Sequence, residues 1–292
     1  GPEYDVEYAR YSNDRAPQFQ ICTEIVNLGR RNALDMENGR KMGAQGNVCP
    51  EKNRDSQSLV VRKRPLSREA AEHVRSMASA EESLAERFRG GELAVNHCRL
   101  VEEEGGEGLP CAEFEFVKGV PLSELMDRAL ARRDQEGLRE FQRLFREYVR
   151  RTSYHCEMEV ADFDLVFSNL MVEGEDWTLI DYEWTFGKAV ETRELAFRAV
   201  YCYLLEDEKR EGILPLDWIM DELQVSLEEA EGFRLQEADF QKYVTGQRLS
   251  MPQMRELIGK KVIKPWKLLS NFQDADQICR VQGYEDRGNG YR

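Results

Sequence analysis

Three polar side chains interrupt the apolar stretch between residues 162 and 184. Asp164 is followed five residues later by Asn169, and the apolar run WTLI then leads into Asp181. An unpaired carboxylate in apolar surroundings costs several kcal/mol, so these acids need a compensating partner. Magnesium prefers oxygen ligands of this kind and keeps several of its waters. The residue types and their spacing therefore predict a divalent-cation site.

A cation held in this way is typical of phosphoryl transfer from a nucleoside triphosphate. One carboxylate and one neutral oxygen hold the metal on the phosphates, and a second carboxylate faces the acceptor hydroxyl. An apolar strand that ends in aspartate, together with an upstream Asp-x4-Asn, is the arrangement of the protein-kinase type. Glu183, two residues after Asp181, is interpreted as a hydrogen-bonded structural acid in preference to a metal neighbour.

Composition excludes several classes of protein. The 292 residues carry 41 basic and 55 acidic side chains, a net charge of −14, which argues against nucleic-acid binding. No apolar run approaches the roughly 18 residues that span a bilayer, and no signal peptide is visible. The seven cysteines are scattered without a CxxC pair, which indicates reduced thiols. We expect a cytoplasmic protein with no integral membrane segment.

The first part of the chain must supply a sheet. Alternating apolar residues predict five strands, at 4–12, 18–26, 58–65, 93–104 and 109–119. Two helices, 67–78 capped by Ser67 and 79–91 closed by glycines, follow the third strand. The segment 27–57 has little periodicity and is interpreted as a long loop or insertion.

From Pro121 onward, apolar residues recur at helical spacing. Helices are predicted at 122–133, 136–155, 191–208, 215–224 and 226–246, with a loop and a short hairpin holding the polar stretch. The predicted fold class is α+β. A β-rich unit over 3–118 precedes a mainly helical unit over 119–292.

Two segments carry a family resemblance. LIDYEW, which contains Asp181, and EFEFVKGVPLSELM, which begins at Glu113, resemble the metal segment and the hinge of the kinase-like superfamily, in particular aminoglycoside phosphotransferases and choline kinases. The resemblance covers roughly residues 5–205. A fainter likeness is to kinase-like domains that accompany glycosyltransferase or methyltransferase modules in bacterial polysaccharide assembly. The resemblance to the kinase-like superfamily implies a two-lobed fold with a five-stranded N-lobe and a helical C-lobe.

The resemblance also implies roles for residues in the helical part. Asp164 would be the catalytic base that orients the acceptor hydroxyl. Asn169 and Asp181 would hold Mg²⁺. The sequence departs from the family pattern in two places. Asp162 occupies the position where the family usually has histidine. The segment YSNDRAPQF, which joins the first two strands, contains no glycine to cradle phosphates.

Further roles fall on the β-rich part. Lys63 would contact the α- and β-phosphates of ATP. Glu82 would pair with that lysine, with Glu72 and Glu81 as rivals for the role. Backbone groups of Glu115 and Val117 would meet the adenine edge, and Arg15 or Ser12 would replace the glycine loop as a phosphate contact.

The implied function is Mg²⁺-dependent transfer of the ATP γ-phosphoryl group to a hydroxyl of a small molecule or glycan. A pseudokinase-type nucleotide-binding or regulatory module, attached to or associated with a glycosyltransferase or methyltransferase, is the first alternative. A protein kinase is disfavoured because no Ala-Pro-Glu follows Asp181. A nucleotidyl transferase remains a further alternative.

Overall fold

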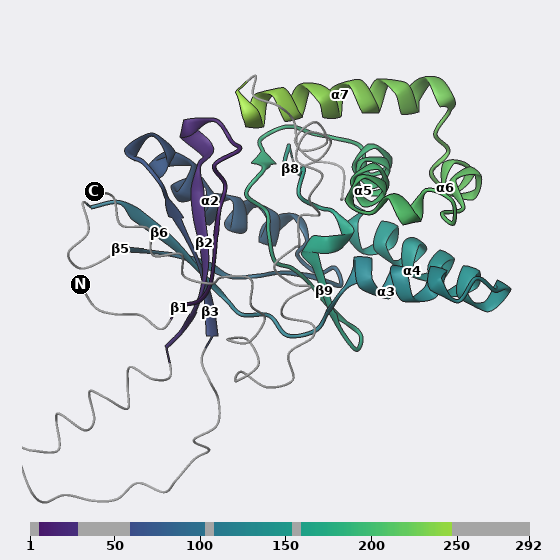
Figure 1. The fold of residues 1–292 in the computed structure, drawn as a ribbon, viewed down its shortest axis with the longest axis horizontal. Coiled ribbons are helices and arrows are strands. Elements are labelled where there is room, and N and C mark those ends of the chain that lie inside the picture. The colour runs from purple at the N-terminus through teal and green to yellow at the C-terminus, as the bar shows by residue number, and fades with distance from the viewer. Residues whose placement is uncertain (1–5, 29–58, 103–107, 154–158, 247–292) are drawn as a thin grey trace, which may run out of the picture.

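A five-stranded antiparallel sheet forms one side of the molecule (Figure 1). The computed structural model describes residues 6–28, 59–102, 108–153 and 159–246. The sheet has the strand order β1 (Val6–Tyr11), β2 (Ile21–Asn27), β3 (Leu59–Pro65), β6 (Pro110–Glu115), β5 (Cys98–Glu102). Five predicted strands therefore become this sheet, and the 27–57 segment lies almost entirely outside the described residues.

Helix α2 (Ala71–Arg87) covers this sheet and contacts β3, β5 and β6. Its buried residues Val74, Met77 and Leu84 recur at helical spacing and face the strands. The prediction of two separate helices here is wrong, because nothing breaks the helix between 71 and 87. The short 3₁₀ helix η2 (Arg68–Ala70) precedes it, and Ser67 makes no capping hydrogen bond with its side chain.

A second, four-stranded sheet was not predicted. Its order is β4 (Leu93–Val95), β10 (Asp176–Leu179), β9 (Leu170–Glu173), β7 (Val120–Pro121). The predicted strand 93–104 is split at Asn96, whose N–H donates to the carbonyl of Leu179 at 2.9 Å. Its first part therefore pairs in parallel with β10, while its second part joins the large sheet. Strands β9 and β10 form the predicted hairpin.

The remaining helices lie across the molecule from the large sheet (Figure 1). They are α3 (Leu122–Ala131), α4 (Gln135–Thr152), α5 (Thr192–Glu206), α6 (Leu216–Leu223) and α7 (Leu227–Thr245). Together with α2, they make six helices in the described part of the chain, so the mixed α and β composition predicted from sequence is confirmed. No helix there is both long and apolar enough to cross a lipid bilayer.

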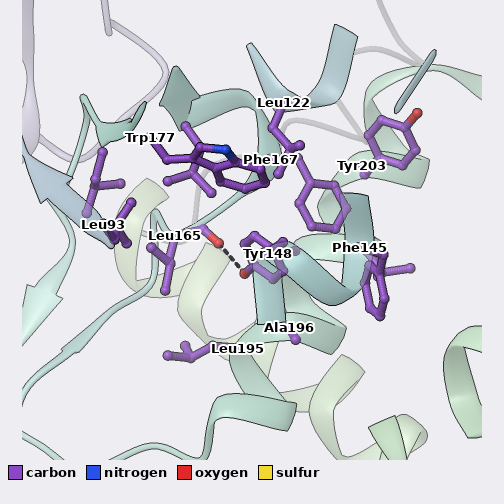
Figure 2. Packing of buried hydrophobic residues seen from close by; sticks show 14 of the residues in the cluster. Leu93, Leu122, Phe145, Tyr148, Leu165, Phe167, Trp177, Leu195, Ala196 and Tyr203 are labelled. Carbon is purple, nitrogen blue, oxygen red and sulfur yellow. Dashed lines mark hydrogen bonds between the residues drawn. The ribbon is translucent and has the colours of Figure 1, made fainter. Parts of the chain in front are cut away.

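The helical core packs around Tyr148 of α4 and Phe167 of the short 3₁₀ helix η3 (Phe167–Asn169) (Figure 2). Their ring centroids are 4.8 Å apart with nearly perpendicular planes. The Tyr148 hydroxyl donates to the carbonyl of Leu165 at 2.7 Å. Because a buried hydroxyl must find such a partner, this bond fixes the loop just after Asp164 against α4.

Helix α7, the last described helix, contacts the first described part of the chain. A capping box between Ser226 and Glu229 begins it, and Gly246, with a φ of 59°, ends it. Near this end, the Ala16 N–H donates to the carbonyl of Val244 at 2.9 Å. The turn between β1 and β2 is therefore attached to the end of α7.

Candidate nucleotide and metal site

Three carboxylates from two segments converge beside the second sheet. Asp164 lies between β8 (Ala161–Asp162) and η3, while Asp181 and Glu183 follow the end of β10. One carboxylate oxygen from each lies within 4.8 Å of the other two. Such proximity of like charges is costly unless a cation compensates it.

Asn169 joins this group through the backbone. Its Nδ2 donates to the Asp164 carbonyl at 3.0 Å, and its own carbonyl accepts from the Ile180 N–H at 2.9 Å. Because the Nδ2 atom of Asn169 donates to the loop, its Oδ1 atom is the one that can bind a metal. Asp164, Asn169 and Asp181 are thus brought together, as their spacing predicts.

Two cations from the large-sheet side neutralise these acids. The Lys63 Nζ atom, on β3, lies 2.6 Å from Asp181 Oδ1 and 3.8 Å from Glu183 Oε2. Arg15, in the β1–β2 turn, binds both carboxylate oxygens of Glu183, at 2.6 and 3.0 Å. Bidentate contacts of this kind are among the stronger hydrogen bonds in proteins. Each acid that follows β10 is therefore paired with a cation from another segment.

The surroundings shift the pKa values of Asp164 and Glu183 in opposite directions. Burial raises the pKa of Asp164 well above its usual range, and the charges of Asp181, Asp162 and Glu183 raise it further. Burial alone would raise the pKa of Glu183 too, but Arg15 and Lys63 hold it well below its usual range. The surroundings therefore disfavour the charge of Asp164 and favour that of Glu183, and an added cation would stabilise the charged form of Asp164.

Asp162 stands where the resemblance expects histidine. Its side chain is buried, and its Oδ1 accepts from the Asp164 N–H at 2.9 Å. Burial is the main cause that raises the pKa of Asp162 to about 8, and repulsion from Asp181 adds to it. Asp162 therefore shapes the backbone that carries Asp164.

A cavity of about 990 Å³ joins these side chains to the segment 114–119 at the end of β6. Its walls include seven of the eight predicted site residues, namely Arg15, Lys63, Glu115, Val117, Asp164, Asn169 and Asp181. Phe114, Ile25 and Val61 give it an apolar part on the sheet side. In that segment, the carbonyl of Glu115 already accepts from Asn96 Nδ2 at 2.9 Å. A concave, partly apolar space with a few converging polar groups is typical of a ligand site.

Glu82 is the predicted residue that lies elsewhere. It is exposed on α2, and it lies roughly 160° around the helix from buried Leu84, since each residue advances about 100°. The predicted pair with Lys63 does not form among the described residues, because Lys63 turns toward Asp181 and Glu183. The rivals do not replace it, since Glu81 lies 3.5 Å from His97 and Glu72 is exposed.

Glu183 is hydrogen-bonded, as predicted, and His73 was missed. Glu183 is buried and accepts from Arg15, and it also lies within 4.8 Å of the other two carboxylates. Its separation of two residues from Asp181 was the available signal, because both can then face one side of an extended segment. His73 approaches Glu183 from α2, and no feature of its local sequence indicates this.

Comparison with known proteins adds no relative. No protein-family model matches the chain, and no curated protein matches it with significant similarity. Function therefore has to be inferred from the site itself.

Proposed function

We propose that the protein is a Mg²⁺-dependent phosphotransferase that moves the γ-phosphoryl group of ATP to a hydroxyl group, on a two-lobed kinase-like fold. The observation that carries the proposal is that Asp164, Asn169 and Asp181 line one cavity together with Lys63, whose Nζ lies 2.6 Å from Asp181. Phosphoryl transfer needs this combination, because catalysis rests on positioning and on compensation of the phosphate charge.

In this proposal Asn169 and Asp181 hold the metal, with Glu183 close enough to join them. The donor set fits Mg²⁺, since it consists of oxygen atoms from carboxylates and an amide. When bound, Mg²⁺ supplies compensation for the charge of the β- and γ-phosphates. Lys63 and Arg15 bind the phosphate oxygens, and Glu183 keeps both cations beside them.

Asp164 orients the acceptor hydroxyl and takes its proton. It lines the cavity, and one of its carboxylate oxygens lies within 4.8 Å of an oxygen of Asp181, so an acceptor hydroxyl that enters the cavity can reach it beside the metal position. The cavity continues from Asp164 along α5 and α7, past Tyr201, Glu206 and Gln241, and this wall is the proposed acceptor side. A small molecule or a glycan fits this space better than a folded protein surface would.

A nucleotide-binding module without transfer activity is the second candidate. The observation that favours it is the close pairing of Lys63 with Asp181 and of Arg15 with Glu183, which leaves the acids neutralised in the absence of a ligand. The absence of glycine between β1 and β2 points the same way. Both candidates bind a nucleotide, and they differ in whether a phosphoryl group moves.

The test uses ATP labelled on the γ- or the α-phosphate, with the purified protein and pools of sugars or glycans. Transfer of the γ label, lost in Asp181→Asn and retained in the exposed control Asp176→Asn, supports the phosphotransferase. Nucleotide binding without any transfer supports the binding module. Transfer of the α label indicates nucleotidyl transfer, and absence of Mg²⁺-dependent binding removes both candidates.

A further inference from the structure

Helix α2 reaches the candidate site through a histidine. His73 lies in its first turn, and its side chain is buried. The His73 Nε2 atom lies 3.4 Å from Glu183 Oε2 and makes no geometrically complete hydrogen bond among the described residues. A buried imidazole nitrogen needs a partner, and Glu183 is the acidic side chain within its reach.

Two aromatic rings hold the imidazole in place. The His73 ring centroid is 4.8 Å from that of Trp184 and 5.2 Å from that of Phe19, which approaches edge-on. The Arg15 guanidinium lies over the same Trp184 ring at 5.3 Å. Because both rings are themselves buried, His73 has little freedom to leave Glu183.

Glu183 thereby receives groups from three separate segments. Arg15 comes from the β1–β2 turn, Lys63 from β3, and His73 from α2. A carboxylate held from several sides can present its oxygens in one orientation, and supporting contacts of this kind commonly decide the affinity of a metal or phosphate site. The sequence interpretation assigned the link between α2 and the site to Glu82, which is exposed.

The geometry points to His73 as a positioning residue: it holds Glu183, and through it Arg15 and Lys63, in the arrangement that binds the metal and the phosphates. This inference rests on the proposed function. The predicted link from α2 to the site is a pair between Glu82 and Lys63. The observed link is the imidazole of His73, which contacts Glu183, and the site is assembled around Glu183.

The test compares three variants by titration with ATP in the presence of Mg²⁺. His73→Leu removes the polar contact and lowers affinity about tenfold or more, the usual cost of losing a supporting partner. His73→Gln keeps a hydrogen-bond donor and restores affinity to within about threefold of wild type. Val74→Ala, also buried on α2 but pointing into the sheet, controls for lost packing and changes affinity less than about threefold.

A double-mutant cycle separates this inference from the proposed function, because it needs no nucleotide. His73→Leu and Glu183→Gln, alone and combined, are compared by urea unfolding, and non-additive changes support direct coupling of the two side chains. Additive changes, or an equal loss of affinity in His73→Leu and Val74→Ala, would overturn the inference. If His73 and Glu183 are coupled but the protein binds no nucleotide, the proposed function is rejected. His73 is then a structural residue, and its positioning role is overturned as well.

Discussion

Arg198 on α5 and Glu237 on α7 form an ion pair directly behind the loop of Asp164. The Arg198 Nε atom lies 2.5 Å from Glu237 Oε2, and both side chains are almost fully buried. Arg198 also donates to the carbonyl of Phe163, the residue before Asp164. One guanidinium thus joins two helices to the loop that carries the proposed base.

Removing one partner of this pair is expected to destabilise the fold strongly. Glu237→Leu leaves Arg198 buried without its carboxylate, and we expect a loss of about 3–5 kcal/mol in the free energy of unfolding. The double variant Arg198→Met with Glu237→Leu removes both charges and is expected to recover most of that loss. Urea unfolding measures both. A loss below about 1 kcal/mol in Glu237→Leu, the value of an exposed ion pair, would contradict the expectation that Arg198 needs its buried carboxylate partner.

Asp164→Asn is expected to abolish transfer while leaving nucleotide binding intact. The amide cannot take the acceptor proton, and general-base contributions are typically about 10²–10⁴-fold in rate. We therefore expect kcat to fall by at least about 100-fold while the Kd for ATP with Mg²⁺ stays within about threefold. Asp176→Asn, on the exposed start of β10, is the matched control. An equal loss of binding and turnover would place Asp164 in ligand binding instead.

Lys63→Met is expected to change the affinities for the nucleotide and for the metal in opposite directions. Lys63 competes with a metal for Asp181 at 2.6 Å, and a unit charge near 4 Å is worth ~4 kcal/mol close to a protein surface. Loss of this competitor should strengthen binding of Mg²⁺ alone by about tenfold after screening, while ATP binding weakens. Calorimetry with each ligand measures this, with exposed Lys209→Met, outside the cavity, as the control. Unchanged Mg²⁺ affinity would show that Lys63 does not occupy the metal position.

Acid stability is expected to depend on Glu113. Its buried carboxylate accepts from Arg62 at 2.8 Å and from Arg99 on β5. Burial alone would raise its pKa, but the hydrogen bonds from Arg99 and Arg62 lower it below the ordinary value. The folded pKa lies below the unfolded value of about 4.3, so this stabilisation is complete above that pH and is lost as the pH falls further.

Glu113→Gln removes that titration. Urea unfolding at a series of pH values from neutral to acidic should therefore give a shallower loss of stability below about pH 4.3 in the variant than in the wild type. Glu140→Gln is the control, since Glu140 pairs with Arg143 on an exposed helix surface where ion pairs contribute little. Identical acid slopes in wild type and Glu113→Gln would contradict the expectation.

Local patterns were sufficient for the elements and for part of the site. Helical spacing placed α5, α6 and α7 within a residue or two, and the Asp164, Asn169 and Asp181 spacing predicted residues that the structure brings together. Their separation along the chain is short, so a loop and one hairpin are enough to assemble them.

Partners that are distant in sequence were not predictable in this way. The partners of Lys63 lie 118 and 120 residues further along the chain, and only tertiary packing decides that it meets Asp181 and not Glu82. The parallel pairing of β4 with β10 is of the same kind, since each three- or four-residue strand reads as an ordinary apolar run. His73 was overlooked because a lone histidine on a helix carries no local signal of its partner.

The bond between Ala16 and Val244 also bears on the order in which the protein can be built. Arg15 stands beside Ala16, whose N–H is bound by a residue more than 220 positions later. Folding of a chain dominated by such remote contacts is slow, because a long loop must close before they form. A ribosome making this protein must therefore complete nearly all of α7 before the Ala16–Val244 bond can form, and a product stopped after α5 would expose Phe163 and Trp184, which pack against Phe240 of α7.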